Sequence, residues 1–333
     1  MLLIDSGYGG RFYPPLKNAL LCLLKHYPGA EINMLLTHVD ADHIRGFKRL
    51  FTDSAFERYY KNISAFYYNT TDCILTAFKG LGEKDLAPVK EEELIFTGKK
   101  TSYADALTLE KHLTGKGIPV ISGLFSGKRL SLGTDIQALA LTPTRDAAES
   151  YRKWLLRKKS RKTSADTDYG CSLESLKENQ FTEDFNEVNA SSVSILLEAY
   201  GCRLLFLGDA PPRYVSQALR KQGVSGNKKL EVDFVKLSHH ASRRSTSPEL
   251  LNLIRGKRFL ISGNGTQGHP DKECLARVID TQEKPIFCLN HDIDRKIFFK
   301  EELESGEFAI EYGNKWEADG DGIRCSKEDF NSD

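Results

Sequence analysis

The feature that most constrains this chain is a dense cluster of metal-binding residue types directly after an apolar run. Residues 32–37 read INMLLT, which predicts a buried β-strand, and residues 38–43 read HVDADH. Imidazole and carboxylate groups are costly to bury without partners, so packing alone does not explain four of them within six positions. Neutral imidazoles and ionised carboxylates are usual protein ligands of zinc and manganese. The pattern therefore predicts a metal site at the carboxyl end of a strand.

Three further segments carry the same residue types near the ends of predicted strands. Asp209 follows LLFLG, His239 and His240 follow VKLS, and His269 comes shortly after RFLISGNG. Helical patterns alternate with these strands, which is typical of an α/β fold. Because ligands of open α/β sheets gather at the carboxyl edge of the strands, we expect the four segments to meet there.

Composition adds limits on function and location. The 333 residues carry a formal net charge of +1, so no overall field attracts nucleic acid or a membrane surface. No apolar run approaches the ~20 residues that span a bilayer, and residues 1–10 lack the basic start and long apolar core of a signal peptide. The seven cysteines include no C-x-x-C pair, and several lie in apolar runs. This indicates reduced thiols and a cytoplasmic location.

The motif set as a whole resembles the metallo-β-lactamase fold. THVDADHIRG is similar to its H-x-[HD]-x-D-H signature. NASSVSILLEAYGCRLLFLGD, VKLSHHASRRSTS and SGNGTQGHP are similar to the ComEC-type hydrolase domain of competence proteins. The resemblance covers roughly residues 1–290 and implies an α/β, four-layer βαβα sandwich with two sheets face to face and helices outside. The strands that usually precede LLIDSG do not precede it here, so we expect that they are lost or lie upstream of Met1.

Two parts of the chain depart from this pattern. Residues 145–188 are polar, helical at first and then loop-like, and we expect an insertion there. Residues 291–333 are expected to form a C-terminal extension that packs on the hydrolase domain or trails from it.

The resemblance implies two divalent ions, zinc or manganese. Their implied ligands are His38 and Asp40 for the first ion, Asp42, His43 and His240 for the second, and Asp209 for both. Which of His239 and His240 binds metal stays open. Many family members have another histidine ligand between the first motif and the bridging aspartate. Here His112 is the only histidine in that interval, and it lies in a predicted helix.

The remaining implied roles surround the ions. Asp42, His239 and His269 are the candidate catalytic residues, with the two histidines as acid or charge stabiliser. Asp5, at the end of the strand LLID, is implied to steady the metal loop from behind the ligands. Asn189 stands where this branch of the family often carries asparagine, and we place it behind the ligands as well.

The implied reaction is hydrolysis by a water that loses a proton between the two ions. The favoured substrate is a phosphodiester of nucleic acid or a nucleotide. Lys236 and Arg243 flank the His-His pair and are candidate contacts for phosphate oxygens, with ordinary surface charge as the alternative. The basic run at 152–162, with Trp154, is a candidate for phosphate contacts and base stacking, with a solvated helix face as the alternative.

Two other kinds of function stay open. The first is a different hydrolase, a lactonase or a phosphocholine-type esterase, because one fold hosts many activities. The second is a partner-bound effector or scaffold subunit of a larger assembly, in which the metal site is structural. No membrane partner is expected. The sequence sets neither the protein partners nor the oligomeric state.

Overall fold

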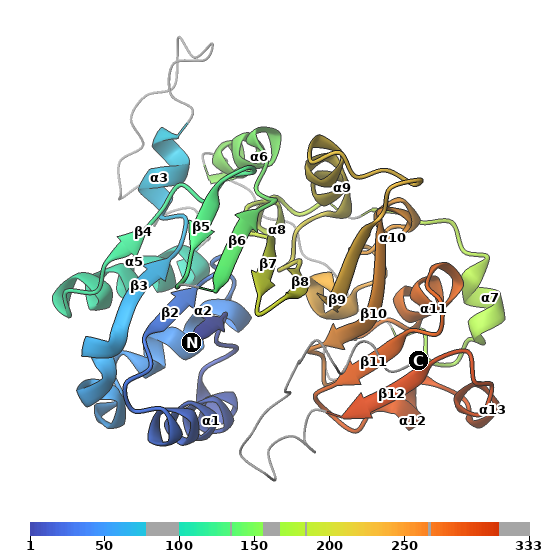
Figure 1. The fold of residues 1–333 in the computed structure, drawn as a ribbon, viewed down its shortest axis with the longest axis horizontal. Coiled ribbons are helices and arrows are strands. Elements are labelled where there is room, and N and C mark those ends of the chain that lie inside the picture. The colour runs from blue at the N-terminus through green and yellow to red at the C-terminus, as the bar shows by residue number, and fades with distance from the viewer. Residues whose placement is uncertain (78–99, 134, 156–166, 184, 266–267, 313–333) are drawn as a thin grey trace.

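A computed structural model describes the chain at residues 1–77, 100–133, 135–155, 167–183, 185–265 and 268–312. Two β-sheets pack face to face, and helices cover the outer face of each sheet (Figure 1). The four-layer α/β sandwich predicted from the sequence is therefore confirmed. Within the ranges just given, no helix combines the length and the apolar character that crossing a bilayer requires.

The smaller sheet contains four parallel strands in the order β1-β2-β3-β4. Successive side chains of a strand face opposite layers. In β2, Met34 therefore packs among the outer helices while Leu35 faces the other sheet. The strands are β1 (Leu2–Ile4), β2 (Ile32–Leu35), β3 (Ile63–Tyr67) and β4 (Val120–Ile121). Their outer helices are α1 (Tyr13–His26), α2 (Ala41–Leu50), α3 (Thr71–Thr76), α5 (Lys100–Gly115) and α6 (Arg145–Leu155).

The larger sheet has eight strands in the order β12-β11-β10-β9-β8-β7-β6-β5. From β5 to β8 neighbours are antiparallel, and from β8 to β12 they are parallel. The strands are β5 (Arg129–Ser131), β6 (Ile136–Ala140), β7 (Ile195–Ala199), β8 (Cys202–Phe206), β9 (Leu230–Lys236), β10 (Ile254–Ile261), β11 (Ile286–Leu289) and β12 (Ala309–Tyr312). Helices on its outer side include α7 (Leu173–Lys177), α9 (Pro212–Lys221), α10 (Pro248–Leu253) and α11 (Lys272–Thr281).

The turn between β7 and β8 is a tight hairpin at residues 200 and 201. Tyr200 and Gly201 both have positive φ, at 51° and 83°, which is the combination that a tight two-residue hairpin turn requires. The hairpin sets β8 beside β9, and these strands run parallel. The segments that follow β8, β9 and β10 therefore leave the sheet at one edge.

The expected insertion and extension both contribute to the packed structure. In the insertion, α6 buries Tyr151 and Leu155 beside the smaller sheet, and α7 buries Leu173 and Leu176 in the core of the larger one. A short helix, α8 (Glu187–Ala190), follows. In the extension, α12 (Asp294–Ile297) and α13 (Lys300–Leu303) lead to β12, which forms the edge of the larger sheet. Residues 156–166 and 313–333 lie outside the described residues.

Candidate metal centre

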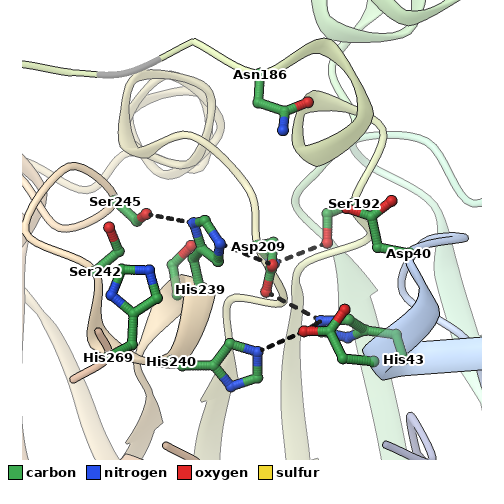
Figure 2. Close-up of polar contacts among 12 residues, drawn as sticks. Asp40, His43, Asn186, Ser192, Asp209, His239, His240, Ser242, Ser245 and His269 are labelled. Carbon is green, nitrogen blue, oxygen red and sulfur yellow. Dashed lines mark hydrogen bonds and ion pairs between the residues drawn. The ribbon is translucent and has the colours of Figure 1, made fainter. Parts of the chain in front are cut away.

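The predicted ligands come from loops that leave the strands at one edge of the sandwich. His38 follows β2, and α2 then begins at Ala41. Asp209 follows β8, and His240 follows β9. In Figure 2, Asp209 lies between His43 on one side and His239 on the other. The structure thus brings together side chains that are up to about two hundred residues apart in sequence.

Three buried atoms in this cluster face one another without a hydrogen-bond partner. His43 Nε2 lies 3.5 Å from Asp209 Oδ1, and His38 Nε2 lies 3.7 Å from Asp209 Oδ2. His38 Nε2, His43 Nε2 and Asp209 Oδ1 are buried and make no hydrogen bond to any residue of the described ranges. Unsatisfied buried polar atoms are rare and need an explanation. A bound cation would satisfy all three at once, so this donor set fits a metal ion.

A second group of ligand atoms overlaps the first. One atom each of Asp42, His43 and His240 lies within 4.8 Å of the others, as do those of His38, His43 and Asp209. His240 Nε2 is 3.1 Å from Asp42 Oδ2, and His43 Nε2 is 3.9 Å from the same oxygen. A single imidazole nitrogen has one lone pair. His43 can therefore complete only one of the two groups.

In each of His38, His43 and His240, the Nδ1 atom lies within hydrogen-bonding distance of another side chain. Nδ1 of His43 lies 2.7 Å from Asp5 Oδ2, and Nδ1 of His240 lies 2.9 Å from Ser262 Oγ. Nδ1 of His38 lies 3.0 Å from Thr37 Oγ1, which in turn donates to Asp5 Oδ2 at 2.9 Å. A carboxylate only accepts, so the proton of His43 sits on Nδ1 and its Nε2 is left for a cation.

Asp40 and His239 stand at the margin of these groups. Asp40 Oδ2 is 3.7 Å from His38 Nε2, but Asp40 belongs to neither group of mutually close ligand atoms. His239 Nε2 is 3.9 Å from Asp209 Oδ2. The ring of His269 lies 5.1 Å from that of His239 (Figure 2). The structure therefore places His240 with the Asp42 group and His239 beside Asp209. His112 lies in α5.

The charges of the cluster are strongly coupled. Burial opposes charge on His43, but the carboxylates of Asp209 and Asp5 outweigh it and raise the pKa of His43 well above its usual value. Burial also opposes charge on Asp209, yet His43 and His239 hold the pKa of Asp209 well below its usual value. For Asp42, a hydrogen bond with His240 and the charge of His43 overcome burial and lower the pKa to about 2. The carboxylates are thus kept ionised, as cation ligands must be.

Asp209 is positioned by a close approach of two backbone segments. Its N–H donates to Ser192 Oγ at 2.9 Å. Gly208, with φ of 54°, makes this approach possible, because an added Cβ would lie 2.3 Å from Ser192 Oγ. On the other side, His239, His240 and Ala241 have φ of 47°, 52° and 65°. Such left-handed residues cost on the order of 1–3 kcal/mol each and persist only where the surroundings enforce them.

Three other predicted residues lie around this cluster. Lys236 Nζ donates to Leu237 O at 2.8 Å. Burial lowers the pKa of Lys236, and the carboxylates of Asp209, Asp5 and Asp42 offset part of that shift. The backbone of Arg243 is fixed by Asp271, whose carboxylate accepts its N–H at 2.8 Å. Asn189 is buried in α8, and its Oδ1 has no hydrogen-bond partner in the described part of the chain.

Part of the basic run at 152–162 is turned inward. Trp154 is half-buried, stacks on Tyr151 with ring centroids 5.7 Å apart and packs against the helices of the smaller sheet. Arg152 is buried, whereas Lys153 is exposed. Residues 156–162 lie outside the described residues. A nucleic-acid contact by this run stays a prediction.

Several residues that shape the site were not singled out in the sequence. Ser6 Oγ donates to His43 O at 2.7 Å and accepts from the N–H of Phe47, also at 2.7 Å, so the loop carrying Asp5 is fixed to α2. Gly46 permits this contact, because an added Cβ would lie 2.0 Å from Ser6 O. Serine and glycine are common in loops, and no local pattern marked these two.

Fold and site together define a mixed α/β protein with a buried histidine and aspartate cluster that fits divalent cations. No protein-family model matches the chain, and no curated protein matches it. Among solved structures, Zn(2+)-bound PqqB from Methylobacterium extorquens is similar, with 12% sequence identity and a TM-score of 0.41. The match covers 97% of this chain and 82% of that one.

Proposed function

We propose that this protein is a hydrolase that uses two divalent cations to cleave phosphodiesters of nucleic acid or nucleotides. The observation that carries the proposal is the set of three buried atoms without partners, His38 Nε2, His43 Nε2 and Asp209 Oδ1. They come from the segment that runs from β2 into the start of α2 and from the loop after β8, and they point at one another. Resemblance of the motifs to ComEC-type hydrolases supports the same class.

The donor set accommodates two ions if Asp209 is shared. His38 and Asp40 would hold one ion, and Asp42, His43 and His240 the other. Asp209 suits the shared position because its Oδ2 lies nearer His38 Nε2 while its Oδ1 lies nearer His43 Nε2. When bound, the ions would lower the pKa of a water and neutralise charge on the attacked group.

Charge favours an anionic substrate over a neutral one. Before the bound water loses its proton, two divalent ions would carry four positive charges, against three negative charges from the carboxylates of Asp40, Asp42 and Asp209. Asp5 and Lys236, which also act on the site, carry opposite charges and largely offset each other. The remaining positive charge would stabilise a phosphodiester and the charge that builds on its oxygens during attack. A lactone carries no charge before attack, so only the charge that builds on its oxygen during attack would benefit.

The chain's own residues prepare the site for this reaction. Asp5 fixes His43 directly and fixes His38 through Thr37, which keeps both Nε2 atoms aimed at Asp209. Burial lowers the pKa of His239, with the charge of Asp209 offsetting part of the effect. His239 is therefore neutral at neutral pH and can accept a proton beside Asp209.

The test is cleavage of single-stranded DNA and of a p-nitrophenyl phosphodiester with added Mn²⁺ or Zn²⁺. We expect the wild type to cleave both and an Asp42→Ala/His43→Ala variant to cleave neither. His26→Ala is a matched control, because His26 lies on the exposed side of α1. Cleavage of a lactone or a phosphocholine ester instead would identify a different hydrolase. Metal binding without any hydrolysis would indicate a structural site.

A further inference from the structure

The aspartate at the start of α11 does not cap its own helix. Asp271 is the residue before Lys272, where α11 begins, but its side chain makes no capping hydrogen bond. Aspartate in this position usually accepts from the first free N–H groups of the helix. Here Asp168, from the expected insertion, accepts from the N–H groups of Lys272 and Glu273 at 2.9 Å each. The carboxylate of Asp271 is thereby free for another task.

That carboxylate connects the two histidine-bearing loops. Asp271 Oδ2 lies 3.1 Å from His269 Nδ1 and accepts the N–H of Arg243 at 2.8 Å. The N–H of Asp271 donates to Ala241 O at 3.0 Å, which fixes the last of the three left-handed residues after β9. Asp271 is only 3% exposed. A buried carboxylate with these partners holds His269 and the His239–Ala241 turn in one fixed arrangement.

The contact determines which nitrogen of His269 carries the proton. A carboxylate has no proton to donate, so Nδ1 of His269 donates to Asp271. Nε2 of His269 has no hydrogen-bond partner among the residues placed in the structure, and the side chain is 22% exposed. The ring stands 5.1 Å from that of His239, on the side of His239 away from Asp209 in Figure 2. Nε2 is therefore the nitrogen of His269 available to a substrate at the edge of the metal site.

We propose that Asp271 is a positioning residue that keeps a proton on Nδ1 of His269, so that Nε2 is the nitrogen that faces the substrate and, in the doubly protonated imidazolium, transfers its proton to the leaving oxygen. The proton-transfer part rests on the proposed phosphodiester hydrolysis. In that reaction the oxygen of water forms a bond to phosphorus, and the bond from phosphorus to the leaving oxygen breaks. The leaving oxygen takes the proton from Nε2 of the imidazolium, which leaves His269 in the neutral Nδ1–H form. His269 then regains a proton as the attacking water gives one up, so the overall change is the addition of one water.

The orienting role can be tested without any activity. Long-range ¹H–¹⁵N NMR distinguishes the two forms of a neutral imidazole, and a His269→Gln variant assigns the signals. We expect the Nδ1–H form in the wild type. In Asp271→Ala the one oxygen that accepts from both Nδ1 of His269 and the N–H of Arg243 is lost, so the imidazole proton can move to Nε2. An Nε2–H form in the wild type, or an unchanged Nδ1–H form in Asp271→Ala, would overturn the proposal.

The proton transfer is tested by changing the leaving group. A nucleoside leaving group needs a proton, whereas p-nitrophenolate leaves without one. Asp271→Ala should therefore lower kcat for a dinucleotide by on the order of 10²–10⁴, the usual size of acid–base catalysis, and for a p-nitrophenyl ester far less. Asp168→Asn is the matched control, because it disturbs the same end of α11 and should affect both substrates alike.

The outcomes separate the two proposals. Equal losses of kcat on both substrates in Asp271→Ala would refute proton transfer by His269. If the wild type cleaves neither ester, the proposed function and the proton transfer both fail, while the NMR result still decides whether Asp271 orients His269. Thermal melting of each variant shows that any loss is measured on folded protein.

Discussion

Replacing Gly208 by alanine should destabilise the fold by about 2–5 kcal/mol. Gly208 has a φ of 54°, and a non-glycine residue in this conformation costs about 1–2 kcal/mol. The added Cβ would also lie 2.3 Å from Ser192 Oγ and 3.3 Å from Thr37 Cβ. Ser192 is fully buried, so the clash adds about 1–3 kcal/mol, the range for overpacked sites. Asp209 would shift with the strand end, and cation affinity should fall as well.

Urea unfolding of the metal-free protein measures this difference. Gly223→Ala is the control, because Gly223 has a φ of 82° but an added Cβ would meet nothing within 4 Å. It should cost only about 1–2 kcal/mol, from the backbone conformation alone. The gap between the two variants isolates the contact with Ser192.

A double-mutant cycle tests the reasoning further. Ser192→Ala removes the oxygen that accepts from the N–H of Asp209 and should cost about 1–3 kcal/mol. It also removes the atom closest to the new Cβ, so Gly208→Ala should cost less in that background, with a coupling of about 1 kcal/mol or more. The reasoning is refuted if Gly208→Ala costs no more than Gly223→Ala, or if the two site mutations are additive within about 0.5 kcal/mol.

Three further predictions follow from the same contacts. Gly46→Ala, which would usually stabilise a helix by about 1 kcal/mol, should instead destabilise the protein, because its Cβ would lie 2.0 Å from Ser6 O; an increase in the urea midpoint would contradict this. Lys272→Ala should lower the free energy of unfolding, measured in urea, by about 3–5 kcal/mol, because Lys272 is fully buried and its Nζ lies 2.7 Å from Glu302 Oε2. A loss below about 1 kcal/mol would show that the ion pair is dispensable. Cation affinity should rise with pH, because the raised pKa of His43 means that a cation must displace its proton. Calorimetry in two buffers should detect the released proton. Affinity that stays constant as pH is lowered would refute the assignment of His43 as a ligand.

The motif residues of the candidate site could be predicted because both their residue types and their positions after strands indicate a metal site. His38, Asp209 and His240 are ligand types that directly follow apolar strands, and strands of this kind end at one edge of a sheet. The two-sheet sandwich was predicted only from the resemblance of these motifs to the metallo-β-lactamase fold. The sharing of His43 between two ligand groups could not be predicted, because it depends on which atoms meet across the two sheets.

Other features depended on distant contacts that leave no local trace. Asp271 reads as an ordinary helix cap, and only the fold shows Asp168 taking over that role from about a hundred residues away. Trp154 in a basic run suggested a stacking surface for bases. In the structure it packs beside Tyr151, because one face of α6 is apolar and covers the smaller sheet.

Anomalous X-ray scattering at the zinc edge from crystals of the zinc-loaded protein tests the central claim most directly. We expect one peak about 2.0–2.2 Å from His38 Nε2 and a carboxylate oxygen of Asp209, and a second at similar distances from His43 Nε2, His240 Nε2 and Asp42. Peaks only at other sites, or no peak beside Asp209 in zinc-saturated crystals, would contradict the account.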